Sequence, residues 1–208
     1  MRKLFVIFCL LSIYAYGQCL SGPLSTRVGI KTGLVFSRYK VNGDDFTGTG
    51  FLIGLGMGTD IFGFLGIDLT PQYRSTAFGH YYPTAIIPFT RTYSYANVYF
   101  PIEISLRAGF IPLVSPYIGL GMAGNIRLGG TESTEFNDGT SINTELGGGQ
   151  ASIFVILKSG LEITLTKFRI SPEFSLNLNS VPDDINTPNQ TEDENLDIHL
   201  SIGFYYSP

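Results

Sequence analysis

The sequence predicts an all-β fold, an eight-stranded antiparallel up-and-down transmembrane β-barrel. Eight segments alternate apolar and polar residues with a period of two, which is the pattern of a strand with one apolar and one polar face. The connections between these segments alternate between short and long, as in a transmembrane barrel whose two ends face different compartments. Together these patterns predict one barrel domain over residues 18–208.

Two neighbouring segments, residues 96–110 and 117–128, show the alternation most clearly. In the first segment every even position is apolar, and the residues between them include Asn97, Glu103 and Arg107. In the second segment the apolar residues again take even positions, at Ile118, Leu120, Met122, Ile126 and Leu128. A hairpin of this kind must cover its apolar face with a second sheet, a bound lipid or a bilayer.

The same alternation predicts the other strands, at residues 27–39, 50–60, 65–74, 150–165, 168–178 and 196–206, and it starts the strand that contains residue 96 near Arg91. Long polar connections are expected at residues 41–49, 75–90, 129–149 and 179–195, and tight turns at 60–63 and 166–167. Pro101 and Pro172 lie inside strands although proline cannot donate to a ladder, so we expect a bulge beside each.

The composition of the two faces predicts which one points inward. The polar face carries a row of glycines, and small residues suit the crowded interior of eight strands: Gly54, Gly56, Gly58, Gly66, Gly119 and Gly121. The apolar face is almost free of charge, as lipid contact requires, and its aromatic residues gather toward strand ends, at Phe36, Phe51 and Tyr73 and at Phe110, Phe168, Phe204 and Tyr206. A soluble lipocalin-like carrier, with the apolar face inward around a ligand, is the alternative.

Residues 1–17 predict a cleaved signal peptide, because Arg2 and Lys3 precede an apolar core and small residues follow at the cleavage spacing. Cys19 is then the one cysteine of the mature chain, either an incidental thiol or a site of lipidation. After this leader no run reaches the roughly 18 apolar residues of a membrane-spanning helix. Basic residues are scattered and the net charge is -4, so no nucleic-acid-binding surface is expected.

The central hairpin also resembles a known family. Residues 95–104, Tyr-Ala-Asn-Val-Tyr-Phe-Pro-Ile-Glu-Ile, and 115–121, Ser-Pro-Tyr-Ile-Gly-Leu-Gly, look like the YLEIP…PYIGAG signature of the PorT-like outer-membrane β-barrels of Bacteroidetes. The final strand, with Ile-Gly-Phe at 202–204, is similar too, whereas Asn97 and Phe100 depart from the commonest pattern. The resemblance implies a monomer in the lipid bilayer of the outer membrane, with envelope or secretion proteins as partners.

The polar face predicts a charged network inside the barrel. Glu103 and Arg107 lie four residues apart on one strand, as do Lys158 and Glu162, so each pair points the same way. Unpaired charges in a narrow interior would cost several kcal/mol each, so we expect a cross-linked structural plug of nearly balanced charge. Its expected members are Arg27, Lys31, Asp68, Arg74, Glu103, Arg107, Arg127, Lys158, Glu162, Arg169, Glu173, Asp197 and His199.

Other polar features give weaker hypotheses. His199, near Asp197 and Glu173, leaves a lipid-modifying enzyme as an alternative, but no Ser-His-acid spacing accompanies it. His80 fits surface recognition in a long loop. The acidic residues of the last loop lack the spacing of a calcium site, and the glycines of residues 54–58 have no helix after them to bind a phosphate. No catalytic residue, metal or other cofactor is expected.

These observations predict a non-enzymatic outer-membrane protein with an envelope or surface role. Its long loops would bind a partner, or its barrel would support a secretion assembly. A small-solute channel is the alternative that the inward row of glycines suggests, and the lipocalin-like carrier is the other.

Overall fold

The computed structural model describes residues 24–41, 44–83, 85–108, 113–181 and 193–208. Within these ranges the chain forms ten strands: β1 (Leu24–Val41), β2 (Asp44–Ile61), β3 (Leu65–Leu69), β4 (Gln72–Tyr82), β5 (Phe89–Arg107), β6 (Val114–Phe136), β7 (Ser141–Leu146), β8 (Ala151–Leu165), β9 (Phe168–Val181) and β10 (Asp193–Tyr206). None of the described residues belongs to a helix that is long and apolar enough to cross a membrane.

The strands close into an antiparallel ring with eight positions in the described part of the chain. β1 pairs with β2 and β10, β5 pairs with β6, and β6, β8, β9 and β10 follow one another around the wall. β3 and β4 share one position, because both pair with β2 on one side and β5 on the other. β7 pairs with the outer part of β6. The predicted all-β, up-and-down arrangement is therefore confirmed.

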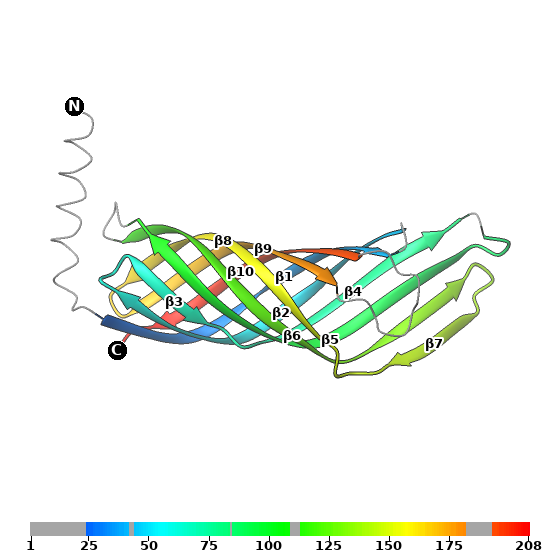
Figure 1. Cartoon of the computed structure of the whole chain (residues 1–208), viewed down its shortest axis with the longest axis horizontal. Coiled ribbons are helices and arrows are strands. Elements are labelled where there is room, and N and C mark those ends of the chain that lie inside the picture. The colour runs from blue at the N-terminus through cyan, green and yellow to red at the C-terminus, as the bar shows by residue number, and fades with distance from the viewer. Residues whose placement is uncertain (1–23, 42–43, 84, 109–112, 182–192) are drawn as a thin grey trace, which may run out of the picture.

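The two ends of the ring differ, as Figure 1 shows. At one end, here called the turn end, lie the start of β1, the C-terminus and the tight turns at residues 62–64 and 166–167. Left-handed backbone at Phe62 (φ 51°), Gly63 (φ 71°) and Thr166 (φ 59°) closes these turns. At the other end, here called the hairpin end, the β4–β5 and β6–β7 hairpins continue beyond the rest of the wall.

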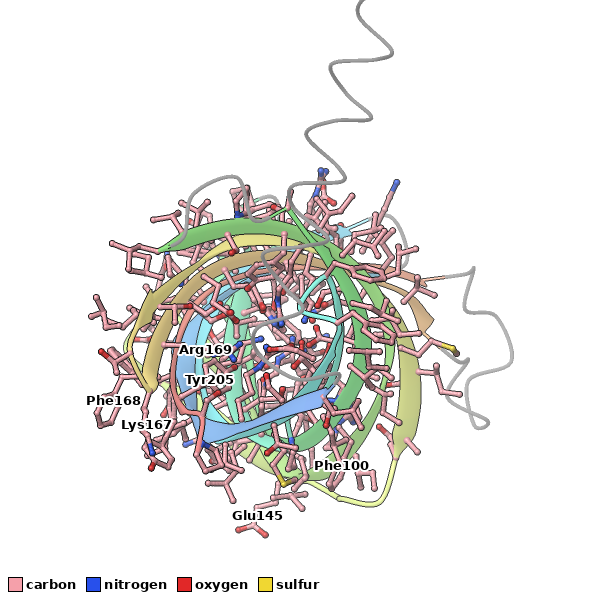
Figure 2. All side chains as sticks on the ribbon, turned by 90° about the vertical axis from the view of Figure 1, so that its left-hand side faces the viewer. Phe100, Glu145, Lys167, Phe168, Arg169 and Tyr205 are labelled. Carbon is pink, nitrogen blue, oxygen red and sulfur yellow. The ribbon has the colours of Figure 1, made fainter. Side chains whose placement is uncertain are left out.

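The alternation of side chains places the apolar face on the outside. Leu55 is 61% exposed, Ile104 54% and Leu200 47%. A lipocalin-like carrier would hold these three side chains inward, so that alternative is wrong. The view along the ring in Figure 2 shows carbon-rich side chains radiating outward and nitrogen and oxygen atoms gathered inside. Exposed aromatic residues flank the apolar band, with Phe36, Phe51 and Tyr73 toward the hairpin end and Phe62, Phe64, Phe168, Phe204 and Tyr206 toward the turn end.

The long loops expected at residues 41–49, 75–90 and 129–149 are wrong in large part, because strands occupy most of them. β1 and β2 stay paired as far as Val41 and Asp44, and β4 and β5 as far as Tyr82 and Phe89. These segments contain many Thr, Tyr and Phe residues, which favour strands even where no continuous apolar face exists. β9 and β10 likewise extend into the expected fourth loop, of which residues 182–192 lie outside the described ranges.

The two strand prolines are accommodated by gaps in a ladder, and the bulges expected beside them are wrong. Pro101 lies opposite residues 70–71, where β3 stops and β4 begins without a change of register. Its carbonyl accepts from Thr70 N (3.3 Å). Pro172 pairs with Ile202 on β10, while the β8–β9 ladder skips the position opposite it. The irregularity that the β5–β6 ladder does contain lies between Ala96 and Asn97.

Some sequence predictions fall outside the described residues. These are the signal peptide at residues 1–17, Cys19, the aromatic position Phe110 and most of the acidic last loop.

Candidate functional site in the barrel interior

A layer of ten charged side chains fills the interior near the turn end. Five are cations and five are carboxylates, and no member has a side chain more than 13% exposed. We call this set the charged layer: Arg27 and Lys31 from β1, Asp60 from β2, Asp68 from β3, Glu103 and Arg107 from β5, Lys158 and Glu162 from β8, and Arg169 and Glu173 from β9. Period-two alternation brings them together, because each occupies an inward position of its strand.

Asp60 lies at the centre of one half of the charged layer. Its carboxylate pairs with Arg27 (2.7 Å), and also with Arg107 and Arg169. Glu162 approaches the same three guanidinium groups at 3.3, 3.7 and 2.9 Å. Three guanidinium groups thus share two carboxylates.

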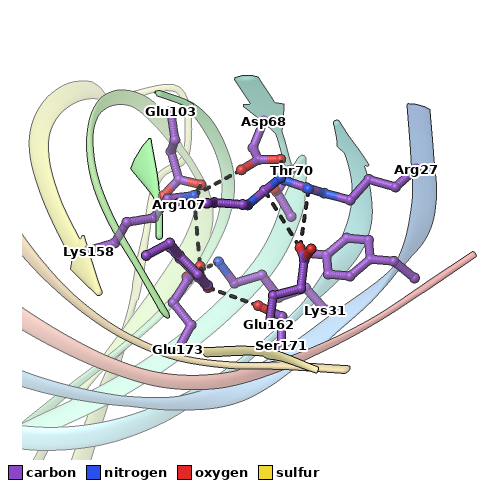
Figure 3. A pocket seen from close by; sticks show the side chains of 12 residues that line it. Arg27, Lys31, Asp68, Thr70, Glu103, Arg107, Lys158, Glu162, Ser171 and Glu173 are labelled. Carbon is purple, nitrogen blue, oxygen red and sulfur yellow. Dashed lines mark hydrogen bonds and ion pairs between the residues drawn. The ribbon is translucent and has the colours of Figure 1, made fainter. Parts of the chain in front are cut away.

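Lys158 organises the other half. Its ammonium group lies 2.9 Å from Glu103, 3.2 Å from Asp68 and 3.8 Å from Glu173. Glu173 also pairs with Lys31 and accepts a hydrogen bond from the Tyr117 hydroxyl (2.9 Å). Asp68 binds Arg27 as well, which joins the two halves into one network, and Figure 3 draws the part of it around Lys158, Asp68 and Glu173.

The charged layer is tightly packed. The free space among its side chains is about 10 Å³, which is room for about one water. The inward glycines leave the volume that the long side chains fill: a Cβ on Gly58 would lie 2.3 Å from Asp68 Oδ1, and one on Gly66 2.8 Å from Arg107 Nη2. A Cβ on Gly56 would lie 2.4 Å from the Tyr205 ring. The arrangement therefore closes the interior at this level.

A second, mixed layer lies further toward the hairpin end. Arg74 pairs with the fully buried Asp197, and its guanidinium carbon lies 5.7 Å from the centre of the Tyr99 ring and 5.8 Å from that of Phe154. The interior also contains buried apolar side chains, which the alternation did not predict: Val35, Leu52, Ala123, Phe154 and Ile156. An ion pair enclosed by apolar groups is held by electrostatic attraction that water barely screens.

His199 belongs to this second layer. Asn177 donates to the His199 ring (2.8 Å to Nε2), and the edge of the Tyr99 ring lies against it, with centroids 5.9 Å apart. The structure thus brings His199 to an amide and an aromatic ring. No group of three His, Cys, Asp or Glu side chains within the described ranges is placed to hold a metal ion.

Of the thirteen residues that the sequence predicts for the network, nine lie in the charged layer, and Arg74, Asp197 and His199 lie in the second layer. Arg127 does not join either layer. It stacks on Tyr95, with its guanidinium carbon 3.9 Å from the ring centre, at the hairpin end of β6. Asp60 was missed because it was assigned to a turn, although it shares the parity of Gly54, Gly56 and Gly58.

The hairpin end carries a cluster of aromatic rings on the face of its strands that continues the barrel interior. We call it the outer aromatic face, because it lies at the hairpin end beyond the apolar band: Phe46, Phe78, His80, Tyr82, Phe89, Tyr93, Tyr95 and Phe136. Cross-strand neighbours pack together, with Tyr82 stacked on Phe89 at 4.7 Å. Polar groups at its border are paired, as Arg91 is with Glu132 (3.1 Å). Partial burial and a hydrogen bond to Asp44 (3.0 Å) raise the pKa of Tyr82 to about 12.

Comparison with known proteins gives likenesses to solved structures. No family model matches the sequence, and no curated protein sequence matches it. The chain is similar to the attachment invasion locus protein Ail of Yersinia pestis, solved with the heparin analogue sucrose octasulfate (15% identity over 87% of this chain and 99% of that chain, TM-score 0.44). It is also similar to Neisserial surface protein A (11%, 85% and 95%, TM-score 0.47) and to the outer membrane protein OprG from Pseudomonas aeruginosa (12%, 88% and 95%, TM-score 0.46). At these TM-scores the likenesses carry no argument about the function of this chain.

Proposed function

We propose that this chain is an integral outer-membrane protein without enzymatic activity, whose closed barrel anchors a surface-exposed β-sheet extension that binds a partner. The observation that carries the proposal is the inverted distribution of polarity. The outside of the wall is apolar between two aromatic borders, whereas the inside holds ten charges in mutual ion pairs. This distribution is favourable in a lipid bilayer. There the closed ring pairs the backbone groups of its strands with one another, and the wall shields the interior charges from lipid.

The interior supports an anchoring role more than a transport role. Opposite charges are balanced one to one in the charged layer, and about 10 Å³ remain free among them. A hydrated ion or small solute needs a continuous path that this packing does not offer. The same pairing supports a structural role for the charged layer and for the Arg74–Asp197 pair, because each carboxylate that a catalyst would use there is already bound to a cation.

The hairpin end is the part that we assign to binding. It projects beyond the apolar band and presents the outer aromatic face, together with the paired charges of Arg91 and Glu132. We further propose that this end faces the outside of the cell, that the chain acts as a monomer, and that a signal peptide at residues 1–17 directs its export. A role in a secretion assembly, as in PorT-like proteins, belongs to the same proposal.

The first experiment is the migration of the membrane fraction on an SDS gel, with and without boiling. A closed barrel resists SDS until it is heated, so the unboiled protein is expected to run faster and to shift on boiling. Recovery in the soluble fraction without a heat shift would contradict the proposal. Protease added to intact cells is expected to cut the β4–β5 or β6–β7 hairpin, and full protection of both would contradict the orientation.

A further inference from the structure

The tip of the β4–β5 hairpin is apolar and unusually exposed. Ile86 is fully exposed (105%), Ile87 is 53% exposed and Tyr81 48% exposed. Residues 81–90 contain no charged side chain. Large apolar side chains that are exposed in one short segment indicate a contact surface, because the exposure of apolar area to water is unfavourable.

The tip lies beyond the reach of the bilayer that holds the barrel. Tyr73 is the last large outward side chain of β4 before the tip, and Ser75, Ala77 and Gly79 follow it on the same face. The nine steps along the chain from Tyr73 to Tyr82 rise about 3.3 Å each on a strand tilted by about 40°, so the tip stands about 20–25 Å beyond the aromatic border. Figure 1 shows this hairpin as one of the furthest points of the hairpin end.

The stem below the tip is held firmly. β4 and β5 remain paired up to Tyr82 and Phe89, whose rings stack at 4.7 Å, and the Tyr82 hydroxyl donates to Asp44 on β2. Pro88 limits the backbone next to Phe89. A tip on an ordered stem loses little conformational freedom when it binds.

We propose that this tip, formed by Tyr81, Ile86 and Ile87, inserts into the surface of a second lipid bilayer, one other than the membrane that holds the barrel. The proposal rests on the proposed function, which turns the hairpin end outward. The two exposed isoleucines lie in the loop between β4 and β5, and the amphipathic Tyr81 lies next to the end of β4, an order of aliphatic and amphipathic residues that suits a membrane interface. A protein-binding surface would carry a polar rim with hydrogen-bonding groups, whereas residues 85–88 are Ala, Ile, Ile and Pro.

Tryptophan fluorescence gives a direct test, because the chain contains no Trp. The Ile86→Trp variant, embedded in nanodiscs of ordinary phosphatidylcholine, is mixed with vesicles of brominated phosphatidylcholine. Insertion of the tip brings the indole beside the bromine atoms, so quenching and a blue shift are expected. Ile142→Trp is the matched control, since Ile142 is also an exposed isoleucine (59%) at the hairpin end but lies on the acidic β6–β7 hairpin. Its fluorescence is expected to stay unchanged.

A second measurement uses the native tip. The native chain is expected to float with added vesicles. Combining Ile86→Ser with Ile87→Ser is expected to weaken vesicle binding about tenfold or more, because the two native side chains would bury their apolar area in the vesicle. Ile142→Ser serves as the control and should bind like the native chain. High salt should leave the native binding intact.

The same samples separate the two proposals. An unquenched Ile86→Trp variant, or a double Ser variant that floats as well as the native chain, overturns the inference if each sample still shows the heat shift of a closed barrel. Loss of native binding in high salt overturns it too, because a charged contact would then be responsible. A native sample without any heat shift contradicts the proposed function itself.

Discussion

Replacement of Asp60 by Asn should destabilise the barrel more than any other single substitution of a carboxylate at its turn end. Asp60 pairs with Arg27, Arg107 and Arg169, and all four side chains are at most 13% exposed. Asparagine keeps the size of the side chain and removes only its charge. Glu162 would then be the carboxylate that all three buried guanidinium groups still share, and Arg27 would keep its pair with Asp68 as well.

The expected magnitude follows from this geometry. Removing one partner of a buried ion pair costs roughly 3–5 kcal/mol, because the remaining charge is left without compensation. Glu162 still lies 2.9–3.7 Å from the three guanidinium groups, so part of the attraction survives. We therefore expect the free energy of unfolding to fall by about 3 kcal/mol, at the lower end of that range.

Urea unfolding of the protein in lipid vesicles measures this change, with the folded fraction read from the heat shift on a gel. Asp45→Asn is the control, because its pair with Arg38 (3.0 Å) is exposed, and no measurable change is expected there. Combining Asp60→Asn with Arg169→Gln should recover part of the loss, since cations and carboxylates are then equal in number again.

If Asp60→Asn lowers the free energy of unfolding by less than about 1 kcal/mol, with the same slope against urea concentration, the expected effect is refuted, because a buried charge that loses its partner destabilises the fold by more than this. It would mean that water reaches the charged layer. A double variant no more stable than Asp60→Asn alone would show that charge balance does not matter there.

Three further predictions follow from the fold. Leu55→Arg, on the outside of the wall, should lower the free energy of unfolding by about 2–4 kcal/mol in a bilayer, as urea titration would reveal; a neutral effect would mean that this face contacts water. The native protein in a planar bilayer should give no single-channel conductance, because so little space remains in the charged layer, and steady conductance steps would contradict a closed interior. Burial and its hydrogen bond to Asp44 raise the pKa of Tyr82 to about 12, so the stabilisation from its neutral phenol is complete below pH of about 10 and is lost as pH rises through about 12. The difference in absorbance between the native chain and Tyr82→Phe should therefore develop near pH 12, and a difference complete by pH 10.5 would contradict this.

The sequence predicted the fold well because the two faces of the wall differ so strongly in polarity. Glu103 and Arg107 could be placed inside from parity alone, and Leu55 and Ile104 outside. The hairpin extensions could not be predicted in this way. In these extensions both faces contact water or packed rings, so the alternation of apolar and polar residues disappears.

The candidate site was predicted in its members but not in its layers. Parity assigns a residue to the inside and says nothing about its height along the barrel. Arg127 illustrates this, since its parity is inward but its strand position puts it against Tyr95 near the hairpin end. The inward Val35 and Leu52 were missed for another reason, because an apolar residue on a polar face looks like an exception in the sequence. It belongs to an apolar set only when a strand that is not its neighbour in the wall, β8, adds Ile156 and Phe154.

The charged layer also constrains how the barrel forms. Its cations and carboxylates come from β1, β2, β3, β5, β8 and β9, and pairs such as Lys158 with Asp68 join strands that are not neighbours in the wall. In the membrane that we propose for this chain, a partly formed sheet would expose some of these charges unpaired to lipid. Insertion one hairpin at a time would therefore be unfavourable there, and we expect the strands to close into the ring while water still reaches the interior.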